Sequence, residues 1–593
     1  MFLATTGLKE FWDDREEVLF LGSWCLQEKL RGNRERIQGR VLPSPWEDRE
    51  RFHRAAEYLD HLSERSLERL TAYLNEIHGT ALTTRYWRIL IGPWLMHYLH
   101  VAYDRYVHLR DAIDRHPRFR TIVLDPSSFH VVRDTTEYMD LMLDDPYNLQ
   151  IISQLLTGMG LSFPQRDLPN RWWTTPAPGS SRTRPGRRTL RASIGQLRNR
   201  FSLGGGESRP IAFFHTTLDR RILSKLVRSI GPTASTLELG PLNSWPSAAP
   251  LFDSRRLELG KLQGSDEFDR IFLKGLPHVF PTCFLEGYTA LRERTLHHAP
   301  SRPQVIVSAV GWYLHESFKL AAAEWAERGT RLIGLQHGGG YGMHRSMPQE
   351  LHERRICDSY LVWGWANGEE GHRIKNAPAP QISHLAEQRL ALPQESGRKI
   401  LFVATTNPRY LHRFNSMPHG TLLGNYFLWQ KRFLKALPDE LQREVLFQPH
   451  PEEYGHGVRE QLSQEFPSLQ WTRRFPFHRN LQDSRLLVID HSGTPLLEAL
   501  AANIPLLLFW NPEHWQIRTD AVPYFEELRD AGILLDSPEA AANGAAERYV
   551  NPRSWWQTPR VQQARGRFVE RYALWRSDWE QEWASTLQQE LGP

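Results

Sequence analysis

The sequence has 593 residues, 40% of them hydrophobic and 24% charged, which is typical of a globular protein with about two to four domains. A net charge of +5 is small for this length and gives no support to nucleic-acid binding, and three distant cysteines without a CxxC pair exclude a zinc ribbon and a disulfide framework. No apolar run approaches the roughly 20 residues that span a bilayer, and the N-terminus lacks a signal-peptide pattern, so we expect a cytoplasmic protein.

Two series of short apolar segments predict strands that are buried on both faces, as in parallel sheets covered by helices. The first series is Val18–Gly22, Thr121–Leu124, Ile211–His215, Val305–Ala309 and Leu332–Leu335. The second series is Tyr360–Trp363, Ile400–Thr405, Val445–Gln448, Leu486–Asp490 and Pro505–Trp510. Helical patterns are found at Arg51–Leu74, Trp87–Arg115, Glu316–Arg328 and Pro495–Ala502. This alternation predicts an α/β protein with two doubly wound, Rossmann-like parallel-sheet domains that face a cleft.

The predicted domains follow from this order. Residues 1–350 form an N-terminal domain with helical insertions at about 45–120, and residues 351–550 form a C-terminal domain. The tryptophan-rich segment 551–593 is a helix that crosses back to the N-terminal domain.

A change of composition marks residues 174–209, where the stretch Ser181–Arg200 holds seven arginines and no acidic residue. Such a segment is either a solvated loop or a basic arm that touches an anionic acceptor or a membrane surface.

The stretch LQHGGGYG closes a predicted strand with Gln336 and His337 and continues with Gly338, Gly339, Gly340 and Gly342. Glycines allow close approach of a backbone, and ligands of open α/β sheets bind at the carboxyl ends of strands. We therefore expect a ligand cradle beside an imidazole, with a flexible loop as the alternative.

A second motif, VLFQPHPEEYG, runs from a strand directly into His450, which Pro449 and Pro451 hold in extended backbone. A rigidly presented imidazole suits a phosphate contact or a general acid, whereas the alternative is a rigid turn with an incidental histidine.

The third motif, LLVIDHSGTPLLEAL, predicts strand, tight turn and helix. Ser492 or Thr494 would cap the helix and Pro495 would fit its first turn. Together with Gly493, the exposed N–H groups and the helix dipole make an anion site, and Glu498 could accept hydrogen bonds from ribose hydroxyls. A capped helix without a ligand is the alternative.

Several other motifs are absent from the sequence: the dinucleotide GxGxxG, the phosphate-binding GxxxxGK[ST], HExxH and GxSxG. We interpret the acidic pairs Asp13-Asp14 and Asp144-Asp145 as helix-start or loop carboxylates and not as metal ligands.

The His-Pro step at Gln448–Pro451 and the turn at Ser492–Thr494 resemble the HP and Ser/Thr motifs of bacterial sialyltransferases and Kdo transferases, within the GT-B architecture of glycosyltransferases. This resemblance implies that His450 contacts the phosphate of a CMP-activated sugar, and that Ser492 and Thr494 cradle it. The donor would lie on the C-terminal domain and the acceptor on the N-terminal domain, with no bound metal and no cofactor.

Six separated motifs, occurring in order from about Leu3 to about Leu535, are similar to a family of bacterial transferases often encoded among surface-polysaccharide genes. They are ATTGLKEFWDD with VLFLGSWC, RYWRILIGPWL, PTCFLEGY, LQHGGGYG, YLVWGWA and DHSGTPLLEAL. By this comparison the catalytic carboxylate is first Glu316 and second Glu286, although Glu316 could simply favour a helix start. Arg85 and Arg88 would pair with an anionic sugar or form internal ion pairs. Gln336, His337 and the glycines would line the cleft from the acceptor side, and His337 would act as a catalytic group that offers a proton or a hydrogen bond to the sugar.

The leading hypothesis is a glycosyltransferase of capsule, O-antigen or lipopolysaccharide biosynthesis that transfers a Kdo-like or nonulosonic acid from a CMP-sugar to a glycan or lipid-linked glycan. It would be cytoplasmic, with peripheral contact at the inner face of the inner membrane. The alternatives are a transferase for a UDP-sugar, GDP-sugar or CDP-polyol, and a non-catalytic sugar-binding subunit of a capsule assembly complex. A nucleic-acid partner has only the arginine cluster in its favour and is not expected.

Overall fold

The structure is a computed structural model of the chain, and it describes residues 1–593 except 14, 27–38, 170–208, 238, 240–253, 369–372, 391–396, 473, 476 and 592–593. The expected arginine-rich loop, with Ser181–Arg200, lies outside the described residues apart from Arg209. Asp14 lies outside them as well.

The first six-stranded sheet is parallel throughout and has the order β11-β10-β9-β8-β6-β7. Its strands are β6 (Ile211–Phe214), β7 (Ala234–Thr236), β8 (Val305–Ser308), β9 (Arg331–Leu335), β10 (Ser359–Val362) and β11 (Ile374–Asn376). Successive residues face opposite sides, and both sides are apolar, so that Ile306 and Leu332 belong to one core cluster and Val305 and Ile333 to another.

The second six-stranded sheet is also parallel and has the order β14-β13-β12-β15-β16-β17. Its strands are β12 (Lys399–Val403), β13 (Val445–Gln448), β14 (Gln470–Trp471), β15 (Ser484–Ile489), β16 (Leu506–Phe509) and β17 (Leu534–Leu535). In chain order this is the 3-2-1-4-5-6 arrangement of a Rossmann sheet. The predicted α/β class with two doubly wound parallel sheets is therefore confirmed.

Three of the expected strands have partners other than those predicted. Val18–Gly22 supplies β2 (Val18–Phe20) of a separate three-stranded sheet with β1 (Phe2–Ala4) and β3 (Gly39–Val41). Thr121–Leu124 supplies β4 (Val123–Leu124), which pairs with β5 (Gln165–Arg166) in a two-stranded sheet. Tyr360–Trp363 supplies β10, which pairs with β9, so the chain passes from the first sheet to the second between β11 and β12. Apolar runs of this length favour a strand but do not specify its neighbour.

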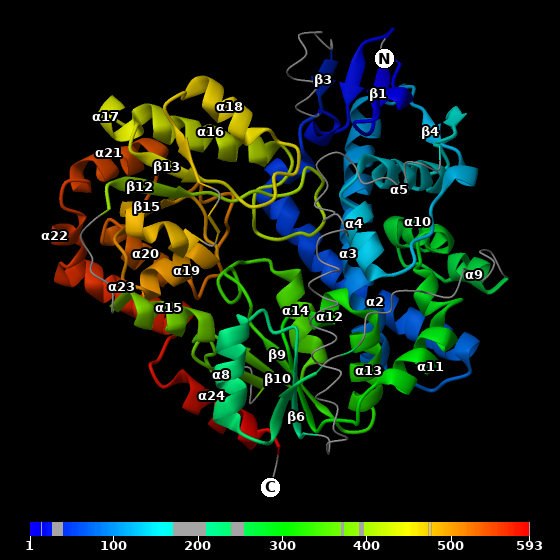
Figure 1. Cartoon of the computed structure of the whole chain (residues 1–593). Coiled ribbons are helices and arrows are strands. Elements are labelled where there is room, and N and C mark those ends of the chain that lie inside the picture. The colour runs from blue at the N-terminus through cyan, green and yellow to red at the C-terminus, as the bar shows by residue number, and fades with distance from the viewer. Residues whose placement is uncertain are drawn as a thin grey trace.

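Long helices precede the first sheet, as predicted for the insertions. Helices α2 (Arg49–His78) and α3 (Thr84–Arg115) pack on one another, and α3 also packs on α13 (Glu316–Ala326), which lies against the first sheet (Figure 1). The remaining helices of this part are α4 (Thr135–Leu141), α5 (Asp145–Gly158), α8 (Arg220–Ile230), α9 (Ser254–Glu258), α10 (Glu267–Gly275), α11 (Tyr288–His298), α12 (Gly311–Leu314), α13 (Glu316–Ala326) and α14 (Pro348–Ile356). None of the described helices is both long and apolar enough to cross a membrane.

Helices cover both faces of the second sheet (Figure 1). They are α15 (Pro380–Leu390), α16 (Thr421–Ala436), α17 (Asp439–Gln442), α18 (Val458–Glu465), α19 (Thr494–Ala501), α20 (Val522–Asp530), α21 (Pro538–Arg548), α22 (Pro552–Trp556) and α23 (Pro559–Tyr572). The last helix, α24 (Trp579–Gln589), returns to the first sheet, where Trp579 and Trp583 are buried against α8.

The carboxyl edges of the two sheets face each other. The loop that follows β9 carries the glycine stretch, and its Arg345 N donates to Gln516 O in the loop that follows β16, at 2.9 Å. In the same pair of loops, Arg518 N donates to Met343 O at 2.8 Å. Because ligands of doubly wound sheets bind at these edges, the fold brings two such edges to one place.

Candidate functional site

The glycine loop after β9 packs directly on the turn before α19. Gly339 N donates to Thr494 Oγ1 at 2.8 Å, and a Cβ on Gly339 would lie 2.4 Å from the carbonyl carbon of Gly493. A Cβ on Gly338 would lie 3.5 Å from Thr494 Oγ1, which is ordinary contact. The close approach of two backbones thus explains the need for glycine at position 339. The first and third sequence motifs meet here.

The prediction that Ser492 or Thr494 caps α19 is wrong. The N-cap residue is Gly493, and no side chain makes a cap hydrogen bond. The two hydroxyls bond across to the other sheet's loop instead, because Ser492 Oγ lies 2.7 Å from His344 Nε2 and Thr494 Oγ1 accepts from Gly339. Pro495 lies in the first turn, as predicted.

Without a side-chain cap, this turn has free donors. Within the described residues, the backbone N–H groups of Ser492, Gly493 and Thr494 make no hydrogen bond, and Gly493 and Thr494 are half-buried. Consecutive unpaired N–H groups at a helix N-terminus form an anion site, to which the helix dipole adds.

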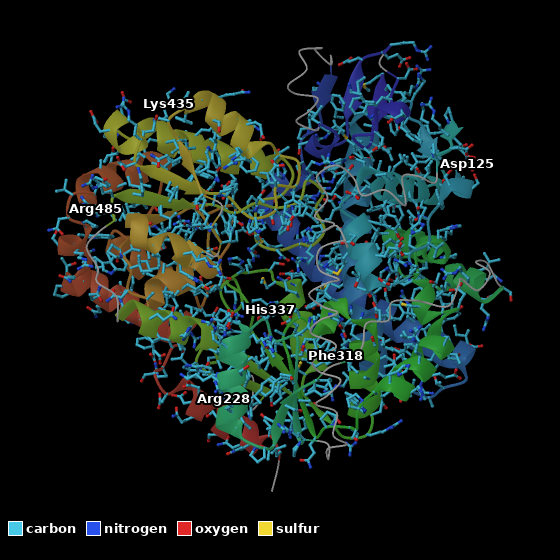
Figure 2. The ribbon with its side chains drawn as sticks, viewed as in Figure 1. Asp125, Arg228, Phe318, His337, Lys435 and Arg485 are labelled. Atoms are coloured by element: carbon cyan, nitrogen blue, oxygen red, sulfur yellow. The ribbon has the colours of Figure 1, made fainter. Side chains whose placement is uncertain are left out.

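His337 lies at the centre of the molecule, between the two sheets (Figure 2). Its Nε2 lies 3.0 Å from Glu353 Oε1 and 2.7 Å from the Tyr341 hydroxyl. Glu353 is fully buried on α14 and also accepts from the hydroxyl of Tyr360. Because a carboxylate only accepts, Nε2 carries the proton in the contact with Glu353, and Nδ1 is the basic nitrogen of the ring.

Gln336, predicted to bind the sugar, is used internally. Its Nε2 donates to Gly338 O at 3.1 Å, and its Oε1 accepts from Trp363 N at 3.0 Å and from Trp365 Nε1 at 2.8 Å. This side chain therefore holds the glycine loop against the segment after β10.

His450 and His491 lie near each other at the carboxyl ends of β13 and β15. His450 Nδ1 lies 3.1 Å from Glu452 N and 3.2 Å from Glu452 O, so the backbone occupies this nitrogen and Nε2 is the nitrogen left to contact a ligand. His491 Nδ1 lies 3.1 Å from Oδ1 of buried Asp490, which also accepts from Tyr426 and Gln430. Burial lowers the pKa of His450. Pro451 is exposed beside it.

Arg413, which the sequence analysis missed, lies in the loop after β12. Its guanidinium is within electrostatic range of Glu353 and of the Tyr341 and Tyr454 hydroxyls, and burial lowers its pKa. It makes no hydrogen bond and no ion pair of its own within the described residues, and its Nε is fully buried. Tyr454 has φ +53° and its ring stacks on His450, so strained backbone next to the HP motif brings that ring beside Arg413.

The neighbours of Arg413 are fixed to the N-terminal part. Arg105 Nη1 donates to Leu411 O at 2.9 Å, and Phe414 N donates to His100 Nδ1 at 2.9 Å. Both anchors are on α3, so the loop after β12 crosses between the two halves and holds Arg413 there. The sequence does hold a signal for this loop, which is the pair of aromatic residues Tyr410 and Phe414. Large aromatic side chains in a loop indicate that the loop packs against another part of the protein, and both rings are buried.

Glu498, predicted to bind ribose, is on α19 one turn beyond the unpaired N–H groups. Within the described residues its carboxyl has no hydrogen bond or ion pair, and burial raises its pKa to about 7. A half-buried carboxyl without a partner is able to accept from ligand hydroxyls.

The other predicted residues have internal partners. Glu316 Oε1 accepts from Thr135 N at 3.0 Å, and its Oε2 lies 2.9 Å from Lys319 Nζ, while burial raises its pKa. Glu286 makes a bidentate pair with buried Arg256.

The two arginines of RYWR also have internal partners. Arg85 donates to Ile356 O at 3.0 and 2.7 Å and to Asp358 at 2.8 Å. Arg88 makes a bidentate pair with Glu64 at 2.6 and 2.5 Å and lines a cavity beside α2. The structure thus gives both arginines the internal ion pairs that were the alternative to sugar binding.

Similar structures have been solved. They include UDP-GlcNAc 2-epimerase from Neisseria meningitidis bound to UDP-GlcNAc, with 10% identity, 64% of this chain and 99% of that chain covered, and a TM-score of 0.36. MurG of Acinetobacter baumannii has 12% identity, the same coverages and a TM-score of 0.32. WaaG, a glycosyltransferase involved in lipopolysaccharide biosynthesis, has 12% identity, 65% and 100% covered, and a TM-score of 0.28. Since these scores are below 0.5, the fold is assigned from the strand order alone.

No curated protein matches the sequence. The model of one protein family does match, over residues 1–587, which is nearly the whole chain. It covers all the strands of both sheets and each of the groups at their facing edges. The chain therefore belongs to the LIC12162 family of transferases.

Proposed function

We propose that the protein is a glycosyltransferase whose nucleotide-sugar donor binds at the carboxyl edge of the second sheet and whose acceptor binds against the first. The donor phosphate would lie between Arg413, the N–H groups of Gly493 and Thr494, and His450 Nε2. Glu498 would accept from the ribose. In this proposal the HP and Ser/Thr motifs favour a CMP-activated Kdo-like or nonulosonic acid.

The observation that carries the proposal is an excess of unpaired donors at one edge. Arg413 is half-buried with a fully buried Nε, and a guanidinium withdrawn from water without an anion is costly, because charged groups inside proteins are normally paired. Arg413 has no partner of its own in the described chain, and unpaired N–H groups lie in the turn after β15. A phosphate dianion offers the acceptors that these groups lack. A subunit that binds only neutral sugars has no need for such an edge.

The proposed chemistry places the base on His337. Its Nδ1 takes the proton of an acceptor hydroxyl while that oxygen bonds to the anomeric carbon, and the bond from that carbon to the phosphate oxygen breaks. Glu353 stabilises the imidazolium, and Arg413 with the N–H groups stabilises the charge on the leaving phosphate. Glu316 is a poorer candidate, since both of its oxygens already have partners.

The partners follow from this chemistry. The acceptor would be a glycan or a lipid-linked glycan, whose hydroxyl reaches His337 from the side of the first sheet. A lipid-linked acceptor would require peripheral contact with the membrane surface. The arginine-rich stretch Ser181–Arg200 has the composition for such a contact.

A thermal-shift panel of CMP, CTP, UDP, GDP and NAD tests the proposal. A nucleotide present at 100 times its Kd adds about 2.7 kcal/mol to the free energy of unfolding. We expect CMP and CTP to give the largest shift, and expect His450→Ala to reduce it. A preference for UDP or GDP would move the donor to the alternative class. If no nucleotide shifts the transition, the transferase proposal fails and a non-catalytic sugar-binding subunit is favoured.

A further inference from the structure

A cavity of about 280 Å³ lies beside the site, and Arg88 is the only predicted site residue of the described chain that lines it. Its walls come from α2, α3, α14, the segment after the glycine loop and the loop after β16 that carries Arg518. One lining residue, His344, bonds through Nε2 to Ser492 Oγ at 2.7 Å. The cavity is therefore next to the turn at which the donor phosphate is proposed to bind.

The arginines of the cavity are already neutralised. Arg88 pairs with Glu64, and Arg355 pairs with Asp60 at 2.5 Å and with Glu64 at 3.0 Å. Ion pairs also hold the other three arginines that line it, which are Arg345, Arg354 and Arg518. Because each cation has a carboxylate partner, the cavity has no surplus positive charge for a phosphate.

Among the buried polar groups that line the cavity are three imidazoles, and the more exposed Glu57 and Ser63 line it as well. His53, His344 and His352 are each more than nine-tenths buried, and one nitrogen of each has no hydrogen-bond partner in the described chain. The three atoms are Nε2 of His53, Nδ1 of His344 and Nε2 of His352. These three atoms have almost no accessible surface and pack against the protein. A ligand in the cavity would instead bond to Nδ1 of His53 or of His352, the second nitrogen of each ring, for which no hydrogen bond is found within the described residues.

The imidazoles are uncharged near neutral pH. Burial lowers the pKa of His53 to about 4 and that of His344 to about 4, and it lowers the pKa of His352 well below its ordinary value. A neutral imidazole both donates and accepts, as a hydroxyl does. No group of three or more His, Cys, Asp or Glu side chains in the described residues is arranged to hold a metal ion.

Apolar side chains complete the walls. Leu59, Met96 and Leu351 line the cavity together with the imidazoles. His352 is held firmly, since a Cβ on Gly92 of α3 would lie 2.6 Å from its ring. The volume is at the small end of ligand pockets, which suits a single small molecule with hydroxyls and a C–H face.

We propose that this cavity binds an uncharged, polyhydroxylated ligand of about one sugar ring, and that it is the acceptor subsite of the transferase. The role as acceptor subsite rests on the proposed function, but the binding of a neutral sugar does not. His53 and His352 would bond to the ring hydroxyls, and His344 would connect the ligand to the turn at Ser492.

Saturation-transfer NMR on the full chain tests the binding directly. The probes are the methyl glycosides of glucose, galactose, mannose and N-acetylglucosamine, with glucuronic acid and inorganic phosphate as charged probes. We expect at least one neutral glycoside to bind and the charged probes to bind more weakly. Binding of none of the neutral glycosides, or preference for a charged probe, would overturn the proposal.

Two variants locate the binding. Ala56→Phe places a ring in the cavity and should abolish glycoside binding, whereas Arg54→Phe, on the same helix but outside the cavity, should bind as the parent does. His53→Phe keeps a ring but removes the nitrogen, and should weaken binding about tenfold without lowering the unfolding temperature. Unchanged glycoside binding in Ala56→Phe, or a loss of stability in His53→Phe with unchanged binding, would contradict the cavity as the site.

The nucleotide panel separates the two proposals. If glycosides bind and Ala56→Phe abolishes that binding while no nucleotide shifts the transition, the cavity stands and the transferase proposal fails. If nucleotides bind and no neutral glycoside does, the cavity proposal fails and the donor site stands.

Discussion

The carboxyl edges of the two sheets face each other but differ in how their polar groups are used. At the edge of the first sheet, His337 is bonded to Glu353, and Gln336 is bonded to Trp363 and Trp365. At the edge of the second, Arg413 and Glu498 have no hydrogen bond or ion pair within the described chain. Paired groups hold a geometry in place, whereas unpaired buried groups indicate a missing partner. In our proposal, the paired groups of the first edge hold the His337 ring in place as the base, and the unpaired groups of the second edge bind the charged part of the donor.

The largest expected effect is on turnover, and it distinguishes His337 from Glu316 as the catalytic group. His337→Gln should lower turnover about a thousandfold, because it removes the proposed base. Glu316→Gln should keep near-normal turnover, since its carboxylate already accepts a hydrogen bond from Thr135 N and is ion-paired with Lys319. It should instead destabilise the fold by about 3 kcal/mol, because it breaks a buried ion pair. Steady-state assays with the donor found by the nucleotide panel, and urea unfolding, measure the two effects. The reverse pattern would return the catalytic role to Glu316.

The next effect contrasts two arginines of one loop. Arg413→Met should weaken nucleotide binding about a hundredfold without lowering the stability of the unliganded protein, because in that state the guanidinium has no ion pair to lose. Arg409→Met should leave binding nearly intact but lower stability by about 3 kcal/mol, since Arg409 Nη2 lies 2.9 Å from buried Asp145. Isothermal titration and chemical unfolding of both variants decide the matter. Full binding by Arg413→Met would show that the unpaired guanidinium is not the phosphate site.

A third prediction concerns the contact between the edges. Gly339→Ala should force the glycine loop away from Gly493 and lower stability by about 2 kcal/mol, because its Cβ would lie 2.4 Å from backbone. Gly338→Ala is the matched control, since its Cβ would meet only Thr494 Oγ1 at 3.5 Å. Thermal unfolding of both variants measures the difference. Equal stability of the two would mean that the edges do not meet as described.

The last effect depends on pH and on Glu498. Its pKa is raised to about 7 by burial, so the folded protein holds this proton more tightly than the unfolded chain does. The stability linked to Glu498 is therefore complete below about pH 4.5 and is lost as pH rises through 7. Glu498→Gln should match the parent near pH 4.5 and exceed its free energy of unfolding by about 3 kcal/mol at pH 8.

The control is Glu539, whose contribution to stability should depend on pH in the opposite direction. A hydrogen bond from Arg432 lowers the pKa of Glu539, so the stability linked to Glu539 is present at neutral pH and is lost in acid. Glu539→Gln should therefore lose a little stability at pH 8 and none in acid. If the stability gained by Glu498→Gln over the parent does not grow with pH, then Glu498 is not a buried carboxyl without a partner.

The sequence was sufficient for much of the fold. The apolar runs predicted every strand from β12 to β16 except the two-residue β14, and the helices of the insertions, because strands buried on both faces have a strong local pattern. It misplaced Tyr360–Trp363, since an apolar segment does not specify which sheet it joins. The folded topology alone decides that pairing.

The candidate site could be predicted only in part. His337, His450 and the turn at Ser492 follow strand ends, and that local signal places them at the sheet edges. Arg413 is 10 residues beyond β12 and reaches the edge only because its loop is anchored on α3. Likewise, the sequence could not show that Arg85 pairs with Asp358 or that Glu286 pairs with Arg256. The partners are separated in the chain, and no motif around Asp358 or Arg256 indicates the pairing.

A crystal structure with the nucleotide that gives the largest thermal shift tests the central claim most directly. We predict that its phosphate lies within hydrogen-bond distance of the Arg413 guanidinium and of the N–H groups of Gly493 and Thr494, with the ribose beside Glu498. A phosphate bound elsewhere, with Arg413 and the turn before α19 still unpaired, would contradict the account.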